Sequence, residues 1–113
     1  MVKLGANINK EDNNGFTPLF SACQEGHIHI VKYLVERGAN IKKKNNDGLT
    51  SLFYTCMKGQ EGVVKYLVEQ GSDINKEENF GFTPLFYACE SGNEVIVKYL
   101  VERGPQLGPW IGP

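Results

Sequence analysis

The sequence of 113 residues has few of the features that mark membrane, secreted or metal-binding proteins. It contains only three cysteines and two histidines, which is too few for a disulfide scaffold, and it has no Cys-x-x-Cys pair. No apolar run approaches the roughly 18 residues needed to cross a membrane, and no secretory leader is visible, so we expect a soluble chain. The formal net charge of −1 gives no general attraction to nucleic acid or to acidic lipid.

What the sequence does contain is an internal repeat with a period of 33 residues. Segments 15–38, 48–71 and 81–104 align over 24 columns, and 13 of these columns are identical in all three copies. Two shared motifs are Gly-x-Thr, which begins at Gly15, Gly48 and Gly81, and Tyr-Leu-Val-Glu, which begins at Tyr33, Tyr66 and Tyr99. We therefore divide the chain into a remnant of a preceding repeat (1–14), three repeats (15–47, 48–80 and 81–104) and a non-repeat tail (105–113).

Each repeat predicts two short helices joined by a turn. Thr17 followed by Pro18 is a typical helix start, so we expect a first helix from residue 18 to about residue 25, ended by Gly26. Apolar residues at helical spacing predict a second helix, which Gly38 ends. Helices this short are not stable alone in water, so they must pair and the pairs must stack on one another.

Three groups of residues carry a resemblance to a known family. They are Gly-Phe-Thr-Pro-Leu at 15–19 and 81–85, Gly-His at 26–27, and Gly-Ala-Asn-Ile at 38–41. With three copies in register, the sequence resembles the ankyrin repeat family. The resemblance implies an all-α solenoid of helix-turn-helix units with β-hairpin loops, built from three full repeats and a partial N-terminal one. It also implies binding of proteins rather than catalysis.

The sequence departs from the family pattern at several positions. Phe20 and its equivalents occupy the column where the family usually has histidine, so we expect an aromatic ladder in place of a histidine hydrogen bond. The middle repeat has Ser51 instead of proline, Thr55 instead of alanine, and Gly62 inside the second helix. Because glycine in a helix interior costs about 1 kcal/mol, we predict that the middle repeat is intrinsically the weakest.

Cysteines and histidines do not suggest an active site. Cys23, Cys56 and Cys89 share one column, and the resemblance implies that equivalent positions lie one repeat apart, too far for a disulfide. We expect these thiols to be small, buried and reduced, which favours the cytoplasm and leaves the nucleus open. Only Cys23 and His27 could form a catalytic pair, and a buried thiol is a poor nucleophile. We therefore predict no enzyme activity, no cofactor and no metal.

The resemblance implies that a partner protein or peptide binds on the concave face, formed by loop tips and first helices. Copies one and three differ only at the end of the first helix and in the following turn, apart from one column, so these positions diverge while the packing columns stay fixed. Neutral drift of exposed positions explains this equally well. The expected partner-binding residues are Glu11, Asn13, Asn14, Phe16, Gln24, Glu25, Lys44, Asn46, Asp47, Leu49, Tyr54, Met57, Lys58, Glu77, Asn79, Phe80, Phe82, Tyr87, Glu90 and Ser91.

Charge along this face is uneven. The middle loop carries Lys42, Lys43 and Lys44, with Lys58 nearby, whereas the outer loops carry acidic residues. This pattern predicts a partner with an acidic centre, although well-solvated loop tips would also account for it. Two other functions stay open: a passive spacer within a longer ankyrin array, and a substrate for hydroxylation at Asn75, which lies in a family-typical loop pattern.

The two ends of the sequence differ from the repeats. Residues 5–8 match the loop start of a preceding copy whose helices are absent, so we expect this chain to be part of a longer array. At the other end, Gly108, Pro109 and Pro113 are unsuitable for a paired strand, and Trp110 is the one tryptophan. Either the tail is disordered, or Trp110 docks on an uncovered end and supports self-association.

Overall fold

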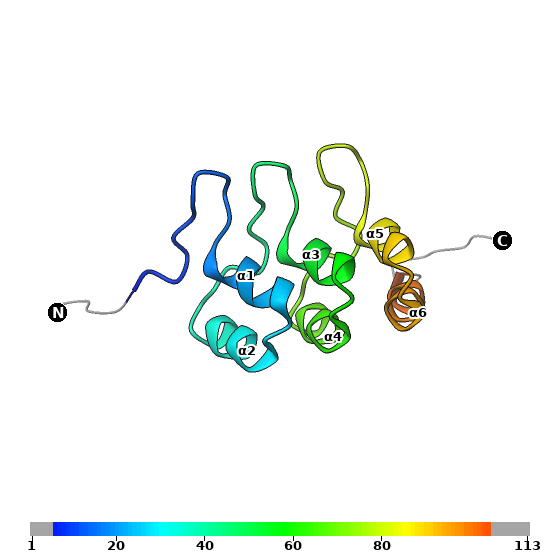
Figure 1. Ribbon diagram of the computed structural model, residues 1–113, viewed down its shortest axis with the longest axis horizontal. Helices are drawn as coiled ribbons and strands as arrows, with labels where there is room; N and C mark the ends of the chain where they lie inside the picture. Colours follow the sequence, from blue (N-terminus) through cyan, green and yellow to red (C-terminus); the bar gives the residue numbers. More distant parts are fainter. Residues whose placement is uncertain (1–5, 105–113) are drawn as a thin grey trace.

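The structure is a computed structural model that describes residues 6–104, and within that range it contains six α-helices and no β-strand. The expected tail with Trp110 and the first five residues lie outside the described range. Figure 1 shows the helices in chain order along a row of repeating units. Their bounds are α1 (Pro18–Glu25), α2 (Ile28–Glu36), α3 (Ser51–Met57), α4 (Glu61–Glu69), α5 (Pro84–Ser91) and α6 (Glu94–Arg103).

Local sequence explains where α1 begins and ends, and α5 follows the same rule. The backbone at Thr17 is extended, with φ −115° and ψ 170°, and Pro18 follows as the first helical residue. Gly26 ends α1 in the left-handed conformation, with φ 72°, which glycine adopts without steric cost. The predicted first helix from residue 18 to about 25 is therefore confirmed. The threonine hydroxyl, however, makes no capping hydrogen bond, so proline and glycine set these bounds.

The helices stack in two rows. Within a repeat, α1 contacts α2, α3 contacts α4, and α5 contacts α6. Between repeats, α3 contacts both α1 and α5, and α4 contacts both α2 and α6. The three loops that precede α1, α3 and α5 all project from the same side of the row (Figure 1). Among the helices described between residues 6 and 104, none is long and apolar enough to span a membrane.

Burial of the repeated apolar columns holds the stack together. A buried apolar side chain contributes about 1.5–3 kcal/mol, and short helices obtain most of their stability this way. Leu52, Phe53 and Cys56 of the middle repeat are fully buried because a repeat lies on either side of them. The buried cluster consists of Leu19, Ala22, Cys23, Val31, Ala39, Leu52, Cys56, Val63, Val64, Leu67, Ala88, Ile96 and Leu100.

The loops differ from the expected β-hairpins. In each loop one backbone hydrogen bond joins the two sides, such as the bond from Asn45 N–H to the Leu49 carbonyl at 2.9 Å. Other backbone groups of the loops bond to side chains or to the neighbouring loop, so no ladder forms that would define a strand within residues 6–104. The expected β-hairpins are thus hydrogen-bonded turns.

One of the three cysteines departs from the expectation of burial. Cys23 and Cys56 are buried, whereas Cys89 in α5 is exposed. The first two lie under the helix of the following repeat, and no described element covers the far side of α5. Position in the stack therefore decides the burial of this column, and the prediction for Cys89 is wrong.

The unusual residues of the middle repeat are accommodated in different ways. Thr55 is fully buried, and its hydroxyl donates to the Leu52 carbonyl at 2.8 Å, so its polar group is satisfied. Ser51 is buried, and its side chain acts to lower the pKa of the Cys23 thiol in the preceding repeat, against the larger effect of burial. Gly62 is exposed, and a β-carbon added there would meet nothing within 4 Å. The cost of Gly62 is therefore one of helix propensity rather than of packing.

Candidate protein-binding surface

The loop face consists of the three loops, residues 6–17, 39–50 and 72–83, together with α1, α3 and α5. Each loop is braced internally by side-chain oxygens, and one of them accepts two backbone hydrogen bonds. Asp12 Oδ1 accepts hydrogen bonds from Asn14 N–H at 2.8 Å and Phe16 N–H at 3.0 Å. Asn45 Oδ1 and Glu78 Oε1 accept from the equivalent amides of their own loops. These hydrogen bonds hold the backbone of each loop in one conformation.

The bracing residues Asp12, Asn45 and Glu78 were not among the predicted partner-binding residues. The sequence feature that could have revealed them is an acceptor side chain three residues before the glycine of each Gly-x-Thr motif. The two later loops gain a second bond from it: Asn45 Nδ2 donates to the Tyr54 hydroxyl at 2.9 Å, and the Tyr87 hydroxyl donates to Glu78 Oε2 at 3.0 Å. This bond ties the loop to the helix that follows it, α3 or α5.

The braces also shift acid–base equilibria. Hydrogen bonds from Phe16 and Asn14 N–H lower the pKa of Asp12. For Glu78, desolvation acts to raise the pKa, but hydrogen bonds from Phe82 N–H, the Tyr87 hydroxyl and other backbone amides outweigh it and lower the pKa. Desolvation and the neighbouring Glu78 carboxylate raise the pKa of Tyr87. The lowered pKa values of Asp12 and Glu78 keep these two carboxylates ionised at neutral pH.

A ladder of asparagines joins one loop to the next. Asn46 Nδ2 donates to the Asn13 carbonyl, and Asn79 Nδ2 donates to the Asn46 carbonyl, both at 3.1 Å. Beside these bonds, Asn46 N–H donates to the Asn14 carbonyl at 2.9 Å and Asn79 N–H to the Asp47 carbonyl at 3.1 Å. The side chains of Asn46 and Asn79, which we expected to bind a partner, are thus engaged in holding the loops in register.

Aromatic rings fill the angle between loops and first helices. Phe16 and Phe20 lie edge to face, with centroids 5.2 Å apart, and Tyr54 of the next repeat packs against both. Phe53 meets Tyr87 in the same way, with centroids 5.8 Å apart. The predicted aromatic ladder therefore runs through the tyrosine of the following repeat, and Phe20 and Phe53 are buried beneath it.

Most of the predicted partner-binding residues lie at the surface of the loop face. Among them, Phe80 at the tip of the third loop has 84% of its surface exposed. The partly buried members are Phe16, Gln24, Tyr54, Met57 and Tyr87. The exposed members are Glu11, Asn13, Asn14, Glu25, Lys44, Asn46, Asp47, Lys58, Glu77, Asn79, Phe80, Phe82, Glu90 and Ser91.

Leu49 is the exception, because it is buried with only 6% of its surface exposed. Its equivalents Phe16 and Phe82 are partly or well exposed. The middle loop lies between two other loops, and the Leu49 backbone closes its neck, so this side chain turns inward. Its expected place at the accessible surface is therefore wrong.

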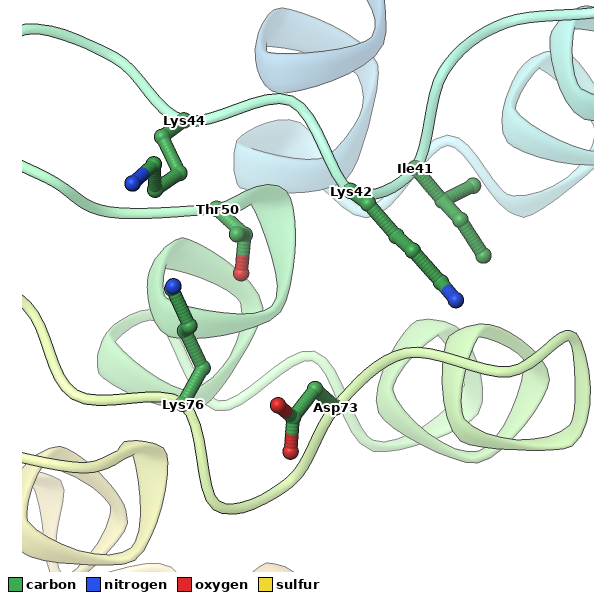
Figure 2. Close-up of a pocket in the computed structure, with 6 residues that line it drawn as sticks. All are labelled: Ile41, Lys42, Lys44, Thr50, Asp73 and Lys76. Carbon is green, nitrogen blue, oxygen red and sulfur yellow. The ribbon is translucent and has the colours of Figure 1, made fainter.

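A pocket with a cluster of positive charge lies between the second and third loops. Figure 2 shows its six lining residues, which come from both loops. Lys44 on one loop and Lys76 on the other flank Thr50 (Figure 2). The Thr50 hydroxyl makes no capping hydrogen bond to α3. The pocket has a volume of about 170 Å³. The lining residues are Ile41, Lys42, Lys44, Thr50, Asp73 and Lys76.

The three adjacent lysines of the middle loop do not act alike. Lys43 Nζ lies 3.3 Å from Glu11 Oε1 on the first loop, so its charge is partly compensated there. Lys42 and Lys44 line the pocket instead, and Lys76, which the sequence analysis did not select, joins them. The sequence could have indicated Lys76, because it occupies the same repeat column as Lys43. The basic centre thus extends toward the third loop.

The two buried thiols have raised pKa values. Burial raises the pKa of both Cys23 and Cys56 to about 12, so neither forms a thiolate at neutral pH. His27 is exposed at the turn after α1, while Cys23 is buried. Within residues 6–104, no group of three or more His, Cys, Asp or Glu side chains is placed to hold a metal ion.

Comparisons with known proteins identify the family. A family model described as ankyrin repeats in three copies matches residues 1–45 and 38–108, which is nearly the whole chain. A segment of 35 residues is 46% identical to protein phosphatase 1 regulatory subunit 27 of Mus musculus. That match covers 31% of this chain and 23% of that protein. The 33-residue period, the stacked helix pairs and the family match agree: this chain belongs to the ankyrin repeat family.

Proposed function

We propose that the chain is a non-enzymatic protein-binding module whose loop face binds an acidic segment of a partner protein. Ankyrin repeats are in general protein-interaction modules, and the similarity to a protein named as a regulatory subunit favours a regulatory rather than a catalytic role. The observation that carries the proposal is the pocket between the second and third loops, where Lys44 and Lys76 flank Thr50 and Lys42 and Asp73 complete the charged lining (Figure 2).

Three physical features support this choice of surface. The loops are held rigid by their own side-chain braces and by the asparagine ladder, so binding costs little conformational entropy. Phe80 and Phe82 offer exposed rings on the third loop, and aromatic residues are typical anchors of protein interfaces. The lysines supply charge that attracts a carboxylate and repels basic segments.

The same proposal places the protein in a reducing compartment, the cytoplasm or the nucleus. Its support is chemical: Cys23, Cys56 and Cys89 are free thiols, and the first two are buried with raised pKa values. A spacer without a ligand of its own is the competing function, and it requires no selectivity at the loop face.

A random-peptide display library screened against the purified chain tests this function. We expect selected peptides to be enriched in Asp and Glu, and their affinity to fall as salt is raised, because the contact is with exposed lysines. The double variant Lys44→Glu/Lys76→Glu should lose this enrichment. Lys65→Glu is the matched control, since Lys65 lies on α4 in the other row of helices.

The library also separates binder from spacer. If the native chain selects no peptide above background, the spacer function is favoured and the proposed function is wrong. If peptides bind but the double variant selects the same sequences with the same salt dependence, the chain is a binder that does not use the basic pocket.

A further inference from the structure

Three ammonium groups line the pocket between the second and third loops, and no salt bridge in the described part of the chain neutralises them. They belong to Lys42, Lys44 and Lys76, and Asp73 is the one carboxylate among the six lining residues. The salt bridge that the described residues do contain belongs to a different lysine, Lys43. The pocket therefore carries an excess of two positive charges, which attracts an anion.

A nearly buried hydroxyl opens into the same pocket. Thr50 has only 8% of its surface exposed, and its hydroxyl neither caps α3 nor forms another hydrogen bond with residues 6–104. Figure 2 shows this hydroxyl pointing from the second loop toward the third, where Lys76 and Asp73 lie. Buried polar groups in proteins normally have a hydrogen-bond partner. A bound group with acceptor oxygens would supply the partner that Thr50 lacks.

The contact between the two loops shapes this pocket independently of the outer faces of the stack. Asn79 Nδ2 donates to the Asn46 carbonyl at 3.1 Å, and Asn79 N–H donates to the Asp47 carbonyl at 3.1 Å. These bonds fix the third loop against the second, so that Lys44 and Lys76 line the pocket from its two sides. The pocket is therefore a feature of two adjacent loops, whatever precedes or follows the described repeats.

The charge and the donors of the pocket fit a phosphate monoester more closely than a carboxylate. A phosphorylated side chain has a charge of about −1.5 to −2 at neutral pH and three acceptor oxygens, whereas Asp or Glu has one charge and two oxygens. The larger charge matches the excess on the pocket, and the three oxygens match the donors of Lys44, Lys76 and Thr50. A volume of about 170 Å³ also admits the group, because a water molecule occupies roughly 30 Å³ in the liquid.

We infer that the pocket binds the phosphate group of a phosphorylated serine or threonine in the partner. This inference rests on the proposed function and names the chemistry of the acidic group that the loop face binds. Lys44 and Lys76 supply charge from the two loops, and the Thr50 hydroxyl donates to a phosphate oxygen. Ile41 is the one apolar residue among the six that line the pocket, so a phosphotyrosine ring finds little surface to pack on. Phosphorylation of the partner thus switches binding on.

Acidic residues on the same loops favour a peptide over a lipid surface or a nucleic acid. Asp47 and Glu77 are exposed on the second and third loops. A membrane or a nucleic acid presents many negative charges across the whole loop face, and these carboxylates repel them. A peptide presents a single phosphate, and basic residues on either side of it pair with Asp47 and Glu77. The expected motif is therefore one phosphorylated residue between Lys or Arg residues.

Three peptide libraries test the inference on the full chain. They differ in one fixed central residue, which is phosphoserine, glutamate or serine, and are random elsewhere. The chain should bind the phosphoserine library most strongly and enrich Lys or Arg beside the fixed residue. One selected peptide is then made in all three forms, and its dissociation constants are measured by fluorescence polarisation. The phosphoserine form should bind about ten-fold more tightly than the glutamate form, because it adds charge and a charge-assisted hydrogen bond, and the serine form should bind most weakly.

Variants of the pocket assign the preference to individual groups. Lys44→Gln/Lys76→Gln should remove the preference for phosphoserine, and Thr50→Val, which keeps the side-chain shape without the hydroxyl, should weaken phosphopeptide binding about three- to ten-fold. Asp73→Asn removes the competing carboxylate and should strengthen phosphopeptide binding roughly two- to five-fold. Lys43→Gln is the matched control, because it makes the same charge change one residue from Lys44 but lies outside the pocket lining. Circular dichroism checks that each variant folds.

The ratio between the forms of one peptide separates this inference from the proposed function. The proposed function requires the glutamate form to bind above background, and its failure to bind would count against that function. A phosphoserine form that binds no more tightly than the glutamate form overturns the inference and leaves the proposed function standing. Equal loss of preference in Lys43→Gln and in Lys44→Gln/Lys76→Gln also overturns it. So does binding of inorganic phosphate as tight as that of the phosphopeptide, which indicates a free-phosphate site, or displacement of the phosphopeptide by phosphatidylserine vesicles, which indicates a lipid-binding surface.

Discussion

The middle and third repeats have the same motif and differ in how much of it is covered. In the middle repeat, Leu49, Phe53 and Cys56 are all buried. Their equivalents in the third repeat, Phe82, Phe86 and Cys89, are all exposed. Yet the middle repeat is the one that departs most from the shared pattern, with a serine for proline and a glycine within its second helix.

This comparison shows that burial in the stack depends on neighbours more than on the residue. A column side chain is covered on one side by the preceding repeat and on the other by the following one. The third repeat keeps its inward contacts, such as the Phe53–Tyr87 contact, and the loop that leads into it keeps the asparagine bond to the middle loop. Cover is lacking only on the outer side. A weak sequence in the middle can thus be stabilised more than a better sequence at the end.

The largest expected effect on stability comes from truncating the equivalent phenylalanines of the middle and third repeats, Phe53 and Phe86. Phe53→Ala should lower the free energy of unfolding by about 3–5 kcal/mol, because it leaves a cavity in a fully packed site. Phe86→Ala should cost less, about 1–2 kcal/mol, because its ring is already partly in water. Urea unfolding of both variants measures the difference. Equal losses would show that position in the stack does not control burial energy.

The asparagine ladder gives the next test, on the inward side where the two repeats should behave alike. Asn46→Ala and Asn79→Ala each remove one side-chain hydrogen bond between loops, and each should cost about 0.5–1.5 kcal/mol. Asn13→Ala is the matched control, because its side chain makes no hydrogen bond within residues 6–104. Thermal unfolding of the three variants should leave Asn13→Ala at the native value. A similar loss in all three would contradict a ladder.

A smaller and opposite effect is expected at Gly62, in the second helix of the middle repeat. Gly62→Ala should raise the free energy of unfolding by about 0.5–1 kcal/mol, because the site is exposed and a β-carbon meets no atom. Chemical denaturation monitored by far-ultraviolet circular dichroism measures the gain. Val95→Ala at the equivalent, exposed position of the third repeat serves as the control and should change stability little. No gain at Gly62 would mean that the middle repeat is not intrinsically weaker.

The smallest effect concerns pH and separates the two tyrosine contacts. Because the folded state lowers the pKa of Glu78, its bond to Tyr87 adds stability above the ordinary value of 4.5, and that contribution is lost as pH falls toward the folded pKa. The amide of Asn45, which bonds to Tyr54, does not titrate in this range. Glu78→Gln should therefore reduce the loss of stability between pH 5 and pH 3. The comparison is made by unfolding both proteins at each pH, and parallel curves would rule out this role for Glu78.

The fold was largely predictable because the same residue pattern occurs three times in the sequence. Thr-Pro and the following glycine marked the bounds of α1, and the apolar columns marked the core faces. The β-hairpins are not confirmed within residues 6–104, because the loop backbone bonds to side-chain oxygens and to the next loop, a choice that composition does not reveal. Loop residues are polar in either arrangement.

The candidate surface was predictable in outline and wrong in some details. The column of loop tips was placed at the surface, but Leu49 turned inward and Lys43 paired with Glu11. The pocket joins Lys44 to Lys76, which are 32 positions apart in the chain and meet only because adjacent loops stack. No pattern within one repeat contains that contact.

The sequence by itself determined the repeat length, the helix bounds and the columns that pack. These are local properties, since caps, glycines and helical periodicity act within a few residues. Only the tertiary structure decided which members of each column are covered, which asparagines bond to a neighbour, and where the lysines converge. The physical reason is that each of these depends on the adjacent repeat: identical side chains are buried inside the stack and exposed at its outer faces.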